Sequence, residues 1–260
     1  MKTFNTLLLS LILVTGLISQ QSGSIKYAES TKLEIKGIEG IDLGDMMPSS
    51  IDTNKELFFD KKVTVYRDAA DNVSEDIELE SDDGSFQMVI GGSDTEEILY
   101  TDIKNKTTIH QTAFMSKEFL IEEKLEKLKW KLTNEKIKYL GYVCQKATAI
   151  QTVDPTPGTD GAPTERSVVA WFTSEIPVPI GPRRFNQLPG AVLMVSIDEG
   201  KTEIKATDVS FETPADDVLQ KPTKGKKVTS EEYNKIVAQK MKEMSEMYGG
   251  REGGAIMIRG

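Results

Sequence analysis

The sequence has one cysteine and one histidine in 260 residues. The lone cysteine, Cys144, excludes an internal disulfide bond. It lies in YLGYVCQKATAI, which reads as a strand, so we expect a buried structural thiol. The lone histidine, His110, limits nucleophilic catalysis, because a Ser–His–Asp or Cys–His site would have to use it. We expect His110 to be a structural or exposed residue of a strand.

Sequence motifs for nucleotide and metal chemistry are also missing. The chain contains no Walker pattern, no Gly-x-Gly-x-x-Gly after a strand and no Gly-x-Ser-x-Gly. Histidine, cysteine and carboxylates do not occur at zinc-ligand spacing. The acidic stretch 68–84 lacks the ligand order of an EF-hand, so we expect a solvated loop. The sequence therefore predicts a non-enzymatic protein without a cofactor, and a hydrolase whose carboxylates meet only in space stays an open alternative.

Long hydrophobic runs are confined to the first 20 residues, MKTFNTLLLSLILVTGLISQ. A basic Lys2, an apolar run of about a dozen residues and a small or polar exit are typical of a secretory signal. A membrane span needs about 20 apolar residues, so cleavage near residues 19–21 is favoured over anchoring. We expect an exported, periplasmic protein with no stable membrane insertion.

The sequence has fewer basic residues than acidic ones. The chain has 32 basic and 41 acidic residues, and loss of Lys2 with the leader leaves 31 basic residues, for a net charge of −10. Nucleic acids and anionic membrane surfaces attract basic proteins, so this balance argues against both as partners.

Short apolar and alternating segments between polar or glycine-containing turns fill most of the chain. This pattern predicts a mainly β fold: an antiparallel curved sheet, a half-barrel or a sandwich, with a C-terminal α-helix. The expected strands are 24–36, 56–67, 85–90, 97–102, 106–112, 119–123, 127–133, 136–150, 167–173, 191–197 and 202–211. The expected organisation is a signal peptide at 1–20, a β-rich domain at 21–212, a linker at 213–228, a helix at 229–248 and a flexible tail at 249–260.

The predicted helix begins with a capping box, in which Thr229 is the N-cap and Glu232 is N3. It carries methionines at 241, 244 and 247, a spacing that places them on neighbouring positions of one helix face. Thioethers are soft ligands that suit Cu(I), so Met241, Met244 and Met247 define an alternative function as a periplasmic copper-binding protein. The competing interpretation is an apolar face that packs on the sheet or on a partner.

The segment 166–195 contains two apolar runs, 168–172 and 191–195, joined by a stretch rich in proline and glycine. Proline fixes φ and glycine permits positive φ, so this stretch predicts a stiff, shaped loop between two buried strands. The prolines and glycines are Pro177, Pro179, Gly181, Pro182, Pro189 and Gly190.

Four elements of the sequence occur in a recognisable order: FLIEEKLEKLKWKL (119–132), GYVCQKATA (141–149), AWFTSEIPVPIGPRRF (170–185) and QLPGAVL (187–193). This set resembles the GLPGLI family of exported proteins from Bacteroidota. Leu188, Pro189 and Gly190 retain the family motif, whereas Gln187 replaces its first glycine and Ala191–Val192 replace Leu–Ile. The resemblance implies a β-rich secreted or periplasmic protein of poorly defined function, without established catalytic residues. Genes of the family often lie beside those of TonB-dependent outer-membrane receptors.

The sequence and the resemblance together predict a non-enzymatic binding or accessory protein that acts with an outer-membrane transporter or envelope protein. Arginine and aromatic side chains are enriched at contact hot spots, so the proline-rich loop is the expected contact surface. Packing of its hydrophobic members against the sheet is an equally open interpretation. The candidate contact residues are Trp171, Phe172, Pro182, Arg183, Arg184, Phe185, Leu188 and Pro189.

Overall fold

The structure is a computed structural model of the whole chain. It describes residues 22–33, 48–70, 77–80, 87–90, 97–155, 157, 161–248 and 256–257. The expected signal peptide, residues 1–20, lies outside the described residues.

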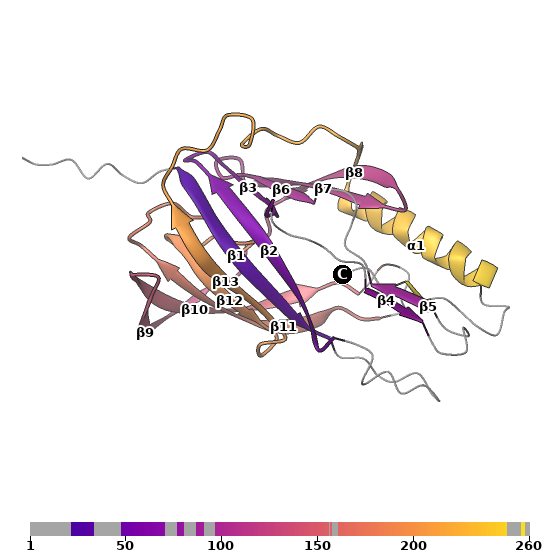
Figure 1. Cartoon of the computed structure of the whole chain (residues 1–260), viewed down its shortest axis with the longest axis horizontal. Helices are drawn as coiled ribbons and strands as arrows, with labels where there is room; N and C mark the ends of the chain where they lie inside the picture. The colour runs from indigo at the N-terminus through magenta and orange to yellow at the C-terminus, as the bar shows by residue number, and fades with distance from the viewer. Residues whose placement is uncertain are drawn as a thin grey trace, which may run out of the picture.

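A single twelve-stranded sheet dominates the described part of the chain, so the prediction of a mainly β fold with a C-terminal helix is confirmed (Figure 1). The strand order is β14-β8-β7-β6-β3-β2-β1-β13-β12-β11-β10-β9. Its strands are β1 (Gly23–Lys32), β2 (Ser50–Phe59), β3 (Val63–Asp68), β6 (Ile98–Asp102), β7 (Thr107–Phe114), β8 (Lys117–Lys124), β9 (Lys131–Tyr139), β10 (Tyr142–Val153), β11 (Thr164–Thr173), β12 (Ala191–Ile197), β13 (Thr202–Ser210) and β14 (Lys226–Val228).

Most neighbours in this sheet pair antiparallel, and many of them are hairpins with short turns, as antiparallel pairing allows. β1 and β13 join the two halves of the chain, because Ser24–Thr31 pair with Thr202–Ser210. A β-bulge or similar irregularity shifts the register of β1 with β13, of β9 with β10 and of β11 with β12. Bulges increase local twist and bend, and the sheet accordingly curves so that both halves face one interior.

The helix α1 (Ser230–Tyr248) lies along β8, at one end of the sheet, while β9 forms the other end (Figure 1). The predicted capping box is present: Glu232 N donates to Thr229 Oγ1 at 3.2 Å, and Thr229 N donates to Glu232 Oε2 at 2.8 Å. Tyr233 and Ile236 pack against Phe119 and neighbouring core residues. The segment predicted as a linker, 213–228, ends in β14, which pairs in parallel with β8 and covers that strand's edge.

A second, three-stranded sheet has the order β15-β5-β4, formed by β15 (Ile256–Met257), β5 (Gln87–Ile90) and β4 (Ile77–Glu80). β15 lies within the tail predicted at 249–260, and it pairs in parallel with β5. β4 lies within the stretch 68–84 that we expected to be a loop.

Three predictions about the strands are wrong. The expected strands 56–67 and 136–150 are each interrupted, at 60–62 and at 140–141, so each belongs to two strands. The alternation of Leu128, Trp130 and Leu132 predicted a strand at 127–133, but β8 ends at Lys124 and β9 begins at Lys131. Leu128 and Trp130 still face the core, and their main chain forms a tight turn in which Trp130 N donates to Leu128 O at 3.1 Å. Leu132, the third residue of the alternation, is in β9 and is 49% exposed, so the alternation marked two side chains that face the core and did not mark a continuous strand.

The main core lies on the concave side of the large sheet. It contains buried residues of β1, β2, β3 and β10 to β13, together with five residues of the segment between β11 and β12. Those five are Ile176, Val178, Ile180, Phe185 and Leu188. The proline-rich segment 174–190 therefore fills the hollow of the sheet, and we call it the core loop.

Candidate functional site

The core loop folds as a chain of γ-turns with prolines at their centres. Val178 N donates to Ile176 O at 2.9 Å, and Ile180 N donates to Val178 O at 2.9 Å. The φ angle of an inverse γ-turn's central residue matches the angle that a proline ring imposes, so Pro177 and Pro179 stabilise this path. The turns point every second side chain inward, and Ile176, Val178 and Ile180 are buried while Pro177 is exposed.

Gly190 closes the core loop at a position that admits no side chain. Its φ is +148°, and an added Cβ would lie 2.0 Å from the carbonyl oxygen of Thr173. The loop thus returns against its own starting strand, in backbone contact. The glycine of the Leu–Pro–Gly sequence is required by this close approach.

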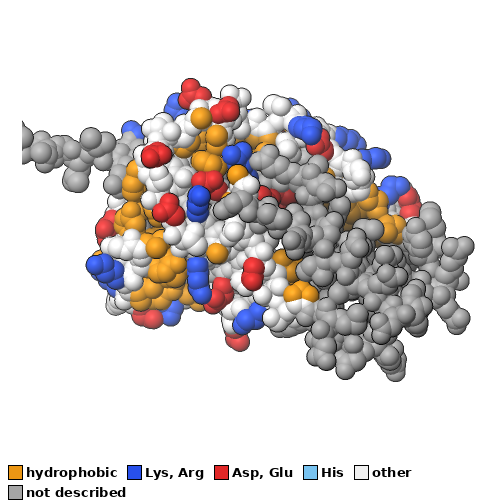
Figure 2. All heavy atoms as spheres, in the orientation of Figure 1, with side chains coloured by type: hydrophobic (Ala, Val, Ile, Leu, Met, Phe, Trp, Pro, Cys, Tyr) orange, Lys and Arg blue, Asp and Glu red, His pale blue; other side chains and the backbone are white. Residues whose placement is uncertain are grey.

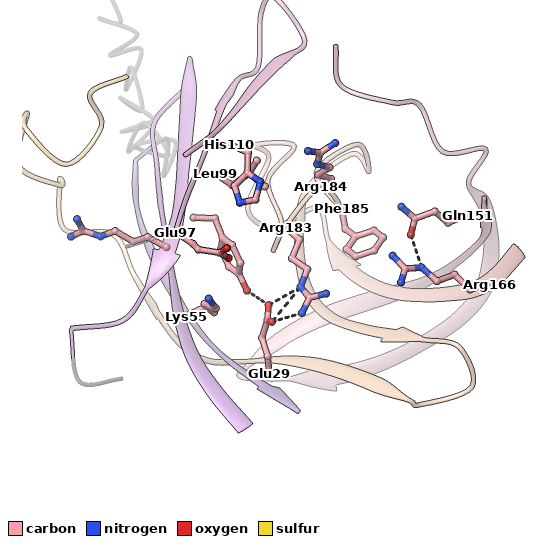
Figure 3. Close-up of a pocket in the computed structure, with 12 residues that line it drawn as sticks. Glu29, Lys55, Glu97, Leu99, His110, Gln151, Arg166, Arg183, Arg184 and Phe185 are labelled. Carbon is pink, nitrogen blue, oxygen red and sulfur yellow. Dashed lines mark hydrogen bonds and ion pairs between the residues drawn. The ribbon is translucent and has the colours of Figure 1, made fainter. Parts of the chain in front are cut away.

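Arg183 fastens the core loop to the sheet. Its Nη2 lies 2.7 Å from Glu29 Oε2, its Nε lies 3.2 Å from both carboxylate oxygens, and Tyr66 Oη donates to Glu29 Oε1 (Figure 3). Only 4% of the Glu29 side chain is exposed, against 41% of the Arg183 side chain. Burial lowers the pKa of Arg183, but the Glu29 carboxylate outweighs it and the net pKa is raised. Arg183 also has a φ of +51°, a strained angle that the ion pair helps to hold.

Two further side chains fasten the core loop to the β8 end of the sheet. Arg184 Nη1 forms an ion pair with Glu123 on β8, and Glu123 also accepts a hydrogen bond from Ser230 Oγ at the start of α1. Gln187 Oε1 accepts from Leu128 N at 3.0 Å, and its Nε2 donates to Glu126 O. Gln187, which departs from the motif in the GLPGLI resemblance, thus holds the connection between β8 and β9.

The eight residues expected at a contact surface divide by burial. Phe172, Pro182, Phe185 and Leu188 are buried, so they pack inside the molecule and offer no exposed surface. Trp171, Arg183 and Arg184 are partly exposed, and Pro189 is exposed. Both arginines make internal ion pairs, which the sequence could not reveal because their carboxylate partners lie 154 and 61 positions away.

Beside Arg183 and Arg184 lies a cavity of about 370 Å³ on the concave side of the sheet (Figure 3). Its lining brings together residues from both halves of the chain. They are Glu29, Lys55, Tyr66 and Arg67 from β1 to β3; Glu97, Leu99 and His110 at β6 and β7; Gln151 and Arg166 from β10 and β11; and Arg183, Arg184 and Phe185 from the core loop. Five of these side chains are lysine or arginine, although the protein as a whole is acidic. The sequence analysis singled out the core-loop members and His110, and no sequence signal marked Gln151 or Arg166.

His110 and Cys144 both lie in environments that favour their neutral forms. Burial lowers the pKa of His110 first, and the positive charge of Arg184 lowers it further against the opposing effect of Glu97. Cys144 is fully buried in the main core, and burial raises its pKa to about 11. Its thiol is therefore a poor thiolate nucleophile or metal ligand at neutral pH.

The methionines of α1 are only partly described by the structure. Met241 is 42% exposed and Met244 is partly buried, whereas the side chain of Met247 lies outside the described part. Within the described ranges, no group of three or more His, Cys, Asp or Glu side chains could hold a metal ion. Copper binding by Met241, Met244 and Met247 stays a prediction.

Residues 130–194 match the model of a family described as "Protein of unknown function (Porph_ging)", which is associated with Bacteroidota. The match covers about a quarter of the chain and runs from the connection before β9 to β12, including the whole core loop. It overlaps most of the stretch that carries the GLPGLI resemblance, whose finer assignment stays a prediction. A search of the curated proteins found no match.

Among solved structures, the chain is similar to PNGF-II in two crystal forms. In the P21 form the TM-score is 0.51 at 17% identity, over 84% of this chain and 33% of that one. In the C2 form the TM-score is 0.49 at 16% identity, over 85% and 32%. LprF from Mycobacterium bovis matches at a TM-score of 0.30 and 9% identity, over 79% of this chain and 91% of that one. The chain spans about a third of the length of PNGF-II, and the likeness shows the fold alone.

Proposed function

We propose that this protein is an exported, non-enzymatic binding protein of the bacterial envelope, which takes a ligand into its concave cavity and acts with an outer-membrane, TonB-dependent transporter. The cavity carries the proposal. It is concave, it mixes polar groups with the apolar Leu99 and Phe185, and its volume of about 370 Å³ lies in the range of small-molecule sites.

The ion pairs between the core loop and the sheet support a preformed site. Arg183 is paired with Glu29, and Arg184 with Glu123, so the loop side of the cavity is fixed to two parts of the sheet. A site that is held in place before binding spends less free energy on ordering side chains when the ligand arrives.

The compartment and the partner class rest on the sequence. The apolar leader supports export with cleavage near residues 19–21, and the GLPGLI resemblance supports an envelope partner. Basic and acidic side chains are interspersed over the described part of the face in Figure 2, which supports a partner other than nucleic acid. No helix in the described ranges is long and apolar enough to cross a membrane.

A tryptophan inside the cavity is expected to weaken ligand binding strongly. Gln151 faces the cavity, and its neighbour Thr152 is exposed on the other face of the same strand. Gln151→Trp should therefore fill the cavity, while Thr152→Trp adds the same side chain outside it. A small-molecule library is screened by ligand-observed NMR against the wild type and both variants.

We expect the wild type and Thr152→Trp to bind the same compounds, and Gln151→Trp to bind them at least roughly tenfold more weakly. Equal binding by Gln151→Trp, or an absence of binders to the wild type, would contradict the proposed function.

A photo-crosslinking amino acid in place of Ser174 is expected to capture the envelope partner. Ser174 is exposed and lies against Gly190, next to the exposed Pro189. The matched control places the same group at Asn134, exposed on the edge strand β9. Crosslinking in the native cells should give one defined product at 174 that is absent at 134. Identical products at both positions, or none at 174, would remove the core loop from the partner interface.

A further inference from the structure

The charges around the cavity are mostly balanced by pairs. Lys55 lies 2.8 Å from Asp68, Arg183 pairs with Glu29, and Arg184 pairs with Glu123. Arg67 places its guanidinium 5.0 Å from the centroid of the Phe58 ring. These contacts account for four of the five basic side chains in the lining.

Arg166 is the fifth basic side chain, and it differs from the others. Its Nε donates to Gln151 Oε1 at 3.0 Å, across the β10–β11 pair in which the two residues are directly opposite. Within the described residues it has no carboxylate at ion-pair distance. Burial is the largest cause that lowers the pKa of Arg166, the nearby charge of Arg183 lowers it further, and the carboxylate of Asp198 opposes both in part. A bound anion would relieve this unfavourable environment.

The geometry of Arg166 leaves a defined binding edge. Gln151 occupies Nε, so the two terminal nitrogens of the guanidinium remain as parallel donors. That edge fits the two oxygens of a carboxylate, and such a bidentate pair is stronger than a neutral hydrogen bond. Figure 3 shows Arg166 and Gln151 on one wall of the cavity.

The opposite wall carries a different chemistry. Glu97, Lys55 and His110 lie on that side in Figure 3. Glu97 Oε1 accepts a hydrogen bond from Thr112 Oγ1 at 3.0 Å, which leaves acceptor capacity on its carboxylate. A negative Glu97 also opposes a doubly charged anion such as phosphate in the same cavity. The wall is therefore suited to a hydroxyl or amine donor of the ligand.

We infer that the cavity binds a small organic acid, whose carboxylate pairs with the terminal nitrogens of Arg166 and whose far end donates a hydrogen bond to Glu97. Leu99 and Phe185 line the same cavity and contact the apolar part of the molecule. Sugar acids and the C-terminal end of short peptides share this chemistry. The inference rests on the proposed function, because it names the ligand class of the proposed binding cavity.

Calorimetric titration with matched probes tests the inference. The pairs are glucuronate against glucose, and alanyl-alanine against its C-terminal amide, with inorganic phosphate as a fifth probe. The variants are Arg166→Gln and, as a control, Lys205→Gln, which removes one positive charge from an exposed residue of β13.

For the wild type and Lys205→Gln, we expect at least one carboxylate to bind roughly tenfold or more tightly than its neutral counterpart. In Arg166→Gln this preference should fall below about twofold. The probe pair in which the acid binds more tightly than its neutral counterpart identifies the ligand as a sugar acid or as the C-terminal end of a peptide. Thermal unfolding should show no loss of stability in Arg166→Gln, because an unpaired, partly buried charge is removed.

Several results would overturn the inference. They are equal affinity for acids and their neutral counterparts, tighter binding of phosphate than of the carboxylates, a preference unchanged in Arg166→Gln, or a large loss of stability in that variant. Binding of neutral compounds that Gln151→Trp weakens would leave the proposed function intact while this inference fails. Absence of any binder to the wild type would contradict both.

Discussion

Replacement of Gly190 by alanine is expected to destabilise the protein by about 3–5 kcal/mol, because a strained backbone angle and a steric overlap add together. The φ of Gly190 is +148°, and the new Cβ would lie 2.0 Å from Thr173 O, a backbone atom that cannot rotate away. For a chain of this size, the thermal midpoint should fall by roughly 10 °C. Thermal unfolding followed by circular dichroism measures the effect.

Gly141→Ala is the matched control for this prediction. Gly141 has a φ of +88° in the turn between β9 and β10, and an added Cβ there would meet nothing within 4 Å. Gly141→Ala should lower the free energy of unfolding by about 1–2 kcal/mol, from the positive φ angle alone. Similar losses in both variants would show that the close approach at Gly190 has little energetic effect.

Replacement of Arg183 by methionine is expected to cost about 2–4 kcal/mol, since it leaves the buried carboxylate of Glu29 without its cation. Tyr66 would remain as its hydrogen-bond donor. The sequence analysis assigned Arg183 to a contact surface, where truncation would change stability little. Chemical denaturation of the variant therefore separates a structural role from a surface role.

A second substitution tests the mechanism of this loss. Arg183→Met combined with Glu29→Gln removes both charges, so we expect the double variant to recover all but about 1 kcal/mol. Lys205→Met is the control, because it breaks an exposed ion pair with Glu203 and should cost less than about 1 kcal/mol. A double variant no more stable than Arg183→Met would show that the loss does not come from the unpaired charge.

Local sequence patterns predicted well those elements of the fold that depend on interactions between neighbouring residues. The capping box at Thr229 and Glu232 places the start of α1 within one residue, because both hydrogen bonds lie inside one turn. Most expected strands overlap observed ones, since alternation records burial directly. The stretch 127–133 is an exception, because Leu128 and Trp130 pack against the core, partly buried, without being in a strand.

The functional interpretation of the core loop needed the fold. Proline and glycine indicated a stiff segment, and its γ-turns explain that stiffness. The sequence does not show that the segment turns inward and fills the concave side of the sheet. Four of the eight residues that we predicted at a contact surface pack in the interior instead. They are Phe172, Pro182, Phe185 and Leu188.

By itself, the sequence determined the mainly β class, the helix and its cap, the rigidity of the core loop and the buried position of Cys144, because each depends on short-range periodicity or on a backbone constraint of one residue. Only the tertiary structure decided which charges are paired and which are available. Glu29 and Arg183 are separated by 154 positions, and Gln151 meets Arg166 across a hairpin. Coulomb energy and desolvation depend on distance in space, so the curvature that joins the two halves of the sheet creates the cavity and leaves Arg166 as its candidate anion-binding side chain.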